Sequence, residues 1–156
     1  MNIVFQTDGD VKSPLRAHDS DSGFDLFSPY EFTLKPDERA TIPMGVKFEI
    51  KTPAFIKLLK FLGVPLLVEG QVRPKSGRSK AGYEVSLGTV DNQYRGGVGV
   101  TIHNYSKKKI KFAKDEKLAQ IVFALVFSSS KFGLIPGEVS EKTERGQKGF
   151  GSSGVK

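Results

Sequence analysis

The chain has 156 residues, of which 38% are hydrophobic and 26% are charged, which predicts one globular domain with a real core. It contains no cysteine, which excludes a disulfide framework and a thiolate metal site. The N-terminus lacks the basic segment and long apolar run of an export signal, so we expect a cytoplasmic protein, or a host-cell cytoplasmic one if it is viral. The net charge of +7 favours a polyanionic partner: nucleic acid, an acidic membrane or a phosphorylated small molecule.

The first third of the chain consists of short apolar runs separated by proline, glycine and polar loops. The runs are Val4–Phe5, Phe24–Phe27, Phe32–Leu34, Ala40–Ile42 and Val46–Ile50. Many short strands at such spacing predict an all-β barrel or sandwich. The second run contains one acid, Asp25.

Residues 54–62 depart from this pattern. Lys57 and Lys60 are three residues apart and apolar residues fill the other faces, which predicts one short helix ended by Gly63 and Pro65. It is too short to span a bilayer. We expect its apolar surface to pack on its own protein or at a subunit contact rather than on a membrane.

The stretch Leu87–Gly96 reads as a strand followed by a turn, and an alternating run, Val98–Ile102, follows it. Together they predict a β-hairpin, with Asp91 and Tyr94 at its mouth. A turn aspartate commonly only bonds turn amides. Taken alone, Asp91 is therefore either a capping carboxylate or a functional one.

The segment Leu118–Phe127 is apolar on both faces, which predicts a strand buried on both faces, either centrally in a sheet or between subunits. Only Gln120 interrupts it. A buried amide needs a hydrogen-bond partner, so Gln120 is either a structural tie or a ligand contact. The upstream lysines at 107–109 favour a solvated edge that discourages strand addition.

The last residues are rich in glycine, and positions 149–154 spell G-x-G-x-x-G. The dinucleotide fingerprint must open a helix inside a strand-helix-strand unit, and that context is missing. Exposed backbone N–H groups, two serines, Arg145 and Lys148 nevertheless predict a phosphate cradle. The alternative is a frayed terminus.

Five islands along the chain resemble the motifs of the trimeric dUTP pyrophosphatase (dUTPase) family, in the family's order. They are Ser22–Leu26, Pro74–Gly77, Gly88–Gly96, Lys117–Gln120 and Arg145–Gly154. The third and fifth are specific signals, and the order of all five strengthens the others. The resemblance implies an all-β, distorted jelly-roll β-barrel over residues 1–140 with one short helix, and a flexible glycine-rich arm, 141–156, that closes over the active site.

The resemblance also implies hydrolysis of dUTP to dUMP and pyrophosphate with Mg²⁺, by a homotrimer whose active sites are shared between three subunits. That activity limits uracil in DNA and supplies dUMP for dTMP synthesis. Asp91 would be the general base for a water that attacks the α-phosphorus in line with pyrophosphate departure. Asp25 would bind Mg²⁺ through water, and Tyr94 would pack under the deoxyribose and exclude a 2′-hydroxyl.

The other implied contacts come from the same motifs. Ser76 and Gln120 would hold phosphate oxygens, and the backbone of the predicted hairpin would read the uracil edge. In the arm, Phe150 would stack on uracil and Arg145 would meet the γ-phosphate. The implied substrate-binding residues are Lys75, Ser76, Gly77, Gly88, Val90, Tyr94, Gln120, Arg145, Phe150, Gly151, Ser152 and Ser153.

The chain departs from the family pattern at several positions. Lys75 and Lys117 stand where the family carries arginine, which keeps the charge but loses the planar bidentate fork. Arg78 replaces a small apolar residue. Residues 54–67 look like an insertion.

Two alternatives follow from the same residues. The insertion could contact a protein partner in a nucleotide-binding regulatory protein. The related dCTP deaminases need a glutamate three residues before an asparagine, and here Asn104 follows Thr101, which disfavours deamination. Stable nucleic-acid or membrane binding is not expected, because aromatic and basic residues do not interleave.

Overall fold

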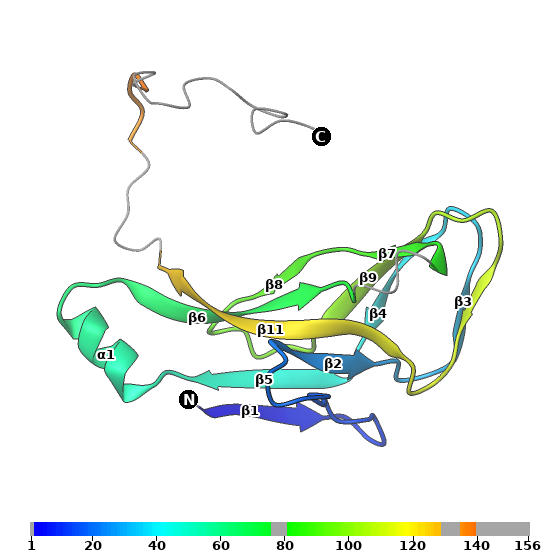
Figure 1. Cartoon of the computed structure of the whole chain (residues 1–156), viewed down its shortest axis with the longest axis horizontal. Helices are drawn as coiled ribbons and strands as arrows, with labels where there is room; N and C mark the ends of the chain where they lie inside the picture. The colour runs from blue at the N-terminus through cyan, green and yellow to red at the C-terminus, as the bar shows by residue number, and fades with distance from the viewer. Residues whose placement is uncertain (1, 76–80, 129–134, 140–156) are drawn as a thin grey trace.

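The computed structural model describes residues 2–75, 81–128 and 135–139. These residues form antiparallel strands and one short helix (Figure 1), which confirms the predicted fold class. The predicted arm at 141–156 lies outside the described residues. The elements are β1 Asn2–Thr7, β2 Gly23–Phe27, β3 Phe32–Leu34, β4 Arg39–Pro43, β5 Val46–Lys51, α1 Ala54–Phe61, β6 Leu66–Arg73, β7 Tyr83–Val85, β8 Gly88–Val90, β9 Gly99–Asn104, β10 Ile110–Phe112 and β11 Lys117–Phe127.

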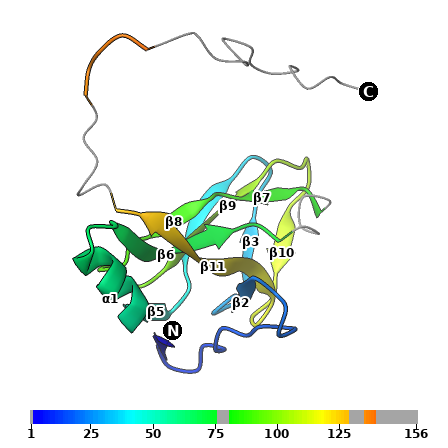
Figure 2. The same ribbon diagram turned by 60° about the vertical axis from the view of Figure 1, so that its left-hand side comes forward.

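Two larger sheets and two smaller ladders make up the described fold. β11 lies inside a four-stranded sheet of order β2-β11-β6-β8, and β9 lies at the centre of a three-stranded sheet of order β4-β9-β7. β1 pairs with β5 and β3 pairs with β10. Figures 1 and 2 show the two larger sheets lying against each other, with α1 at one end and the β3–β10 ladder at the other.

The hairpin predicted over residues 87–102 is wrong. β8 pairs with β6, whereas β9 pairs with β4 and β7, so the intervening residues cross from one sheet to the other. Val98, just before β9, bonds to the turn between β4 and β5, because its N–H donates to the carbonyl of Val46 and its carbonyl accepts from the N–H of Met44, both at 2.8 Å. Turn residues indicate where the chain bends, but they do not determine which strands it joins.

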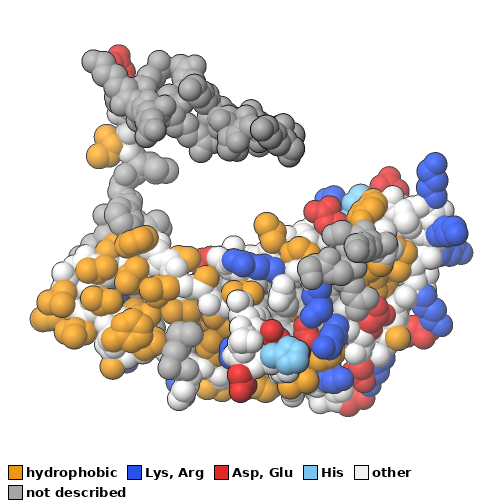
Figure 3. Space-filling model, viewed as in Figure 1, with side chains coloured by type: hydrophobic (Ala, Val, Ile, Leu, Met, Phe, Trp, Pro, Cys, Tyr) orange, Lys and Arg blue, Asp and Glu red, His pale blue; other side chains and the backbone are white. Residues whose placement is uncertain are grey.

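The predicted helix is confirmed as α1, which follows Pro53 and ends before Gly63, whose φ is +88°. Ile56 is buried against Ile50 and Val68. The expectation that the apolar surface of the helix packs on the same chain holds only for this inner side, because Phe61 is 86% exposed. Figure 3 shows the exposed hydrophobic side chains at this end of the molecule. No helix in the described ranges is long and apolar enough to cross a membrane.

β11 is apolar apart from Lys117 and Gln120, yet it is buried along only part of its length. Leu118, Ala119 and Ile121 are fully buried between the sheets. Leu125 and Phe127, near the far end, are 52% and 65% exposed in the single chain. Within the single chain, the predicted burial on both faces is therefore confirmed near the start of the strand, and burial of its far end between subunits stays a prediction.

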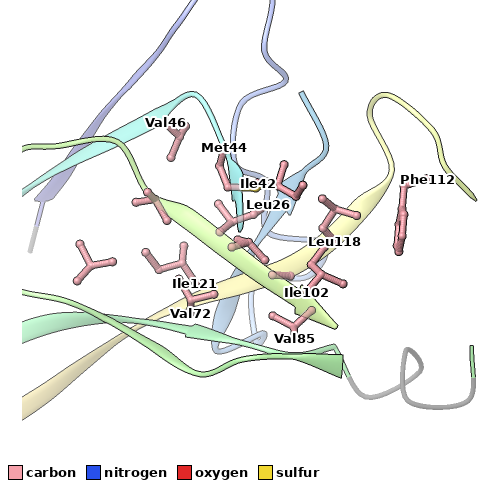
Figure 4. Packing of buried hydrophobic residues seen from close by; sticks show 14 of the residues in the cluster. Leu26, Ile42, Met44, Val46, Val72, Val85, Ile102, Phe112, Leu118 and Ile121 are labelled. Atoms are coloured by element: carbon pink, nitrogen blue, oxygen red, sulfur yellow. The ribbon is translucent and has the colours of Figure 1, made fainter. Parts of the chain in front are cut away.

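The core lies between the two larger sheets, because alternate residues of each strand point inward. In β9, for example, Val100 and Ile102 are buried, and Thr101 between them is only partly buried. Burying one such side chain contributes about 1.5–3 kcal/mol. Figure 4 shows side chains of both sheets lying together, among them Ile42, Val85 and Ile102 from one sheet and Val72, Leu118 and Ile121 from the other.

Asn104, at the end of β9, ties three segments together and is fully buried. Its Nδ2 donates to the carbonyl oxygens of Leu34 (3.1 Å), Lys35 (2.9 Å) and Lys108 (2.8 Å). Its Oδ1 accepts from the N–H and the hydroxyl of Ser106. One side chain thus provides hydrogen-bond partners for backbone groups in the loops that flank the β3–β10 ladder.

Asn104→Ala should lower the free energy of unfolding by about 3 kcal/mol, because it leaves buried carbonyls without donors. Urea denaturation at one fixed protein concentration measures this loss. The control is His103→Ala, which removes only a pairing with Asp37 at 3.0 Å whose carboxylate is almost fully exposed. Equal losses in the two variants would contradict the role given to Asn104.

Candidate functional site

The centre of the candidate site is the carboxylate of Asp25, which β2 buries to 5% exposure. Its Oδ2 lies 2.7 Å from the ammonium of Lys117 at the start of β11, and its Oδ1 pairs with the ammonium of Lys75, just after β6. The antiparallel register brings these positions together, because Gln120 of β11 faces Asp25 on one side and Arg73 on the other. Three distant segments therefore meet at one buried charge.

The electrostatics of Asp25 follow from its burial and its two partners. Burial alone would raise the pKa of the carboxyl, but hydrogen bonds and charge from Lys117 and Lys75 outweigh burial and lower the pKa below its ordinary value. Asp25 is therefore ionised at neutral pH. Two ammonium groups around one carboxylate leave a surplus positive charge.

An open cavity of about 470 Å³ lies over this cluster. Arg73, Lys75 and Lys117 bring three positive charges to its wall, against the carboxylates of Asp21 and Asp25. Such a surface favours an anion with several oxygens. Other lining residues are Ala17, Ser22, Gly23, Gln120 and Val122.

Gln120 and Gly23 shape the floor of this cavity. The Nε2 of Gln120 donates to the carbonyl of Pro74 at 3.1 Å, which confirms the structural tie and leaves its second N–H for another acceptor. A Cβ at position 23 would lie 2.7 Å from Oε1 of Gln120. A side chain at position 23 would therefore displace the Gln120 amide from its present place.

The predicted third motif lies elsewhere on the chain. Asp91 follows β8 and is exposed, and its carboxylate makes no hydrogen bond or ion pair with any described residue, so it does not cap the turn. The turn is held instead by Asn92, whose Nδ2 donates to the carbonyl of Val68 at 2.9 Å. Arg95 also donates to the carbonyls of Asn92 and Tyr94. The backbone that carries Asp91 is thus fixed while its carboxylate is free.

Tyr94 lies across the glycines that follow it. Its hydroxyl donates to the carbonyl of Gly97 at 3.1 Å, and the ring is 47% exposed. A Cβ at Gly96 would be 2.3 Å from the Tyr94 hydroxyl oxygen, so this glycine makes room for the ring. The tyrosine therefore presents one fixed, accessible aromatic surface.

The predicted site residues fall into three groups in the single chain. Asp25, Lys75 and Gln120 meet at the cationic cavity. Gly88 lines a second cavity of about 480 Å³ with Arg73, while Val90 is buried in the core and Asp91 and Tyr94 line neither cavity. The remaining predicted residues lie outside the described ranges: Ser76, Gly77, Arg145, Phe150, Gly151, Ser152 and Ser153.

Two cavity residues, Arg73 and Lys117, were not among the predicted contacts. Arg73 precedes Lys75 by two residues, and strand periodicity would have placed both on one face. Lys117 was noted only as a departure from a family pattern. Its contact with Asp25 depends on the register of β11 against β2, which the sequence alone does not reveal.

The donor set for a metal ion is limited. No group of three or more His, Asp or Glu side chains in the described parts of the chain could hold one. Each oxygen of Asp25 already faces an ammonium, so its remaining lone pairs fit a bound water better than direct coordination. Mg²⁺ fits such a place, because it keeps several waters and is usually held by one or two carboxylates together with phosphates.

Comparisons with known proteins agree with the five motifs. The family model for dUTPase matches residues 10–154. The deoxyuridine 5'-triphosphate nucleotidohydrolase of Clostridium novyi is 37% identical over 98% of both chains. The structure of Staphylococcus bacteriophage 80alpha dUTPase with dUPNHPP matches with a TM-score of 0.75 at 25% identity, over 99% of both chains. A mutant dUTPase from phage phi11 of S. aureus, described as coordinating a structural Mg(II) ion, matches with a TM-score of 0.69 at 20% identity, over 92% of this chain and 99% of that one.

Asp25→Asn should destabilise the fold by about 3 kcal/mol at neutral pH, because it leaves two lysines beside a neutral buried amide. The lowered pKa means that Asp25 adds stability above its unfolded pKa of about 4, and that this stability is lost as pH falls through the folded value. The difference in free energy of unfolding between wild type and variant should therefore become smaller below about pH 4. Thermal unfolding across pH measures it.

The control for this prediction is Asp10→Asn, which breaks an ion pair with Lys114 in which the carboxylate is 86% exposed. Exposed pairs contribute little to stability. If Asp25→Asn lost as little stability as Asp10→Asn, the stabilising role of the buried cluster would be contradicted.

Proposed function

The chain belongs to the dUTPase family, and from this premise we propose that it hydrolyses dUTP to dUMP and pyrophosphate. The observation that carries the proposal is the cationic cavity over Asp25. Residues of the first, second and fourth motifs meet there, and the chemistry of their side chains suits a polyphosphate.

Arg73, Lys75 and Lys117 would bind the phosphate chain of the substrate. Lys75 and Lys117 each give one N–H to Asp25, and an ammonium carries three donors. Lys75 therefore keeps donors for phosphate oxygens while Asp25 fixes its position, and the ammonium of Lys117 adds positive charge beside it. The free N–H of Gln120 would add a neutral donor on the same side.

Asp91 would act as the general base. It would orient the attacking water and accept its proton, and the water would attack the α-phosphorus in line with departure of pyrophosphate. A positioned base contributes about 10²–10⁴-fold, and charge neutralisation by the cavity supplies much of the rest. The free carboxylate on a fixed backbone supports this role.

Tyr94 would select the sugar. Its ring is held by the hydroxyl bond to Gly97, so a deoxyribose can lie on the exposed face while a 2′-hydroxyl would meet an apolar surface without a partner. Gly88 and Val90 would contribute backbone groups to the uracil edge. Ser76, Gly77 and the residues of the arm complete the proposed site.

We propose Mg²⁺ as the metal that accompanies the substrate. Asp25 would hold one of its waters, and the chemistry supplied by the bound ion would be neutralisation of charge on the phosphate oxygens. The lysines beside Asp25 keep the carboxylate ionised for that contact.

We further propose that the functional unit is a homotrimer with shared sites. In one chain the cationic cavity and the cavity at Gly88 share Arg73, whereas the exposed Asp91 lines neither of them. Copies that place these surfaces against each other would complete the site. Deamination of dCTP is disfavoured, because Thr101 stands where an acid is required and its hydroxyl pairs with Thr41 at 2.8 Å.

A panel of dUTP, dCTP, dTTP and UTP, each with Mg²⁺, tests the proposed activity when pyrophosphate and ammonia are measured separately. We expect pyrophosphate from dUTP with kcat/KM at least about 100-fold above the other three, because the site rejects groups that it cannot pair or accommodate. Ammonia from dCTP, or no turnover of dUTP, would refute the activity.

Asp91→Asn should reduce kcat for dUTP by about 10²–10⁴-fold and leave binding of the analogue dUpNHpp within a few-fold of wild type. Asparagine keeps the size of the side chain but cannot accept the proton. Asp19→Asn, an exposed loop acid that lines neither cavity, is the control and should retain full turnover. Normal turnover by Asp91→Asn would exclude it as the base.

A further inference from the structure

Residues 91–97, which we name the crossing, carry the proposed base and the proposed sugar-selecting ring from one large sheet to the other. Before the crossing, Val90 is the last residue that pairs with β6. After it, Val98 bonds to the turn between β4 and β5. Among hydrogen bonds between described residues, a single one ties the crossing itself to another part of the chain. In that bond, Nδ2 of Asn92 donates to the carbonyl of Val68 at 2.9 Å.

The side chain of Asn92 takes the place that the main chain of β8 would have taken. Gly70 pairs with Val90, so the same antiparallel register, continued by two residues, sets Val68 opposite Asn92. The chain leaves the ladder after Val90, and the side-chain amide reaches the carbonyl that a longer strand would have reached. Val68 is buried, and a buried carbonyl needs a donor. Asp91 is therefore held between two residues that are both tied to β6.

The other hydrogen bonds of the crossing between described residues are internal to it. The N–H of Tyr94 donates to the carbonyl of Asp91 at 2.9 Å, and the tyrosine hydroxyl bonds to a glycine carbonyl of the same segment. Nη1 of Arg95 donates to the carbonyls of Asn92 (2.8 Å) and Tyr94 (2.9 Å). These bonds fix the shape of the crossing but not its place against β6, which the Asn92 amide sets.

We propose that Asn92 is a positioning residue that holds the carboxylate of Asp91 and the ring of Tyr94 in place together. It thereby sets both the rate of turnover and the preference for deoxyribose. This role rests on the proposed function, in which Asp91 is the base and Tyr94 selects the sugar. An asparagine suits the place because its amide is a neutral donor, whereas an aspartate would set an acceptor against the carbonyl oxygen of Val68.

Two variants test the tie: Asn92→Ala removes the donor, and Asn92→Asp replaces it with an acceptor of the same size. We expect each to lower kcat for dUTP about 10–100-fold, because a misplacement of about 1 Å can cost about 10²-fold. The ratio of kcat/KM for dUTP to that for UTP should fall about 10-fold, because Tyr94 moves with Asp91. Inhibition by pyrophosphate, which would bind at the cationic cavity, should be unchanged.

The ratio separates positioning from stability, because a loss of folded protein lowers the turnover of dUTP and of UTP equally. The control is Gln93→Ala, at the next position, where the side chain is exposed and makes no hydrogen bond with another described residue. It should match wild type in both measurements. If Asn92→Ala does not fold, Asn92→Asp carries the same test. Unchanged kcat, a lower kcat with an unchanged ratio, or equal losses in Gln93→Ala would overturn the proposal.

Failure of the positioning role and failure of the proposed function give different results in this experiment. A wild-type chain that does not hydrolyse dUTP refutes the proposed function, whatever the variants do. A wild-type chain that hydrolyses dUTP selectively, together with Asn92 variants that match it in kcat and in the ratio of dUTP to UTP, refutes the positioning role of Asn92 alone.

Discussion

The buried charge of Asp25 is the constraint on which the arrangement of the site depends. A carboxylate at 5% exposure needs cations beside it, and they come from the start of β11 and from the segment after β6. Satisfying one acid therefore fixes three segments of the chain against one another. The same pairing leaves an excess of positive charge on the cavity wall, which is the property that a polyphosphate requires.

The two lysines at this cluster, Lys75 and Lys117, both stand where the family carries arginine, and both pair with Asp25. An arginine fork commonly occupies both oxygens of a carboxylate, whereas Lys75 and Lys117 take one oxygen of Asp25 each. The two departures from the family's arginines are thus matched in space although 42 positions separate them in the sequence. Both ammonium groups keep their charge at the cavity wall, so the loss of the planar fork does not remove the attraction of the cavity for an anion.

Local patterns in the sequence predicted the elements but not their neighbours. The short apolar runs became strands and residues 54–61 became α1, because periodicity and glycine or proline breaks act within a few residues. The prediction of a hairpin at 87–102 was wrong because strand pairing is a long-range property, and β8 pairs with β6 rather than with β9. The contact of Lys117 with Asp25 was missed for the same reason. Asp91 and Tyr94 were identified through a family motif. The motif alone could not have revealed the geometry of their side chains.

The separation of the parts has a consequence for how such a site can work. The free carboxylate of Asp91 is on the crossing between the sheets, and the cationic cavity is at the junction of β2, β6 and β11. In the proposed homotrimer, a neighbouring copy would bring the proposed base of one chain and the phosphate site of another to the same substrate. Contacts that hold copies in register then control the chemistry as directly as the catalytic groups do.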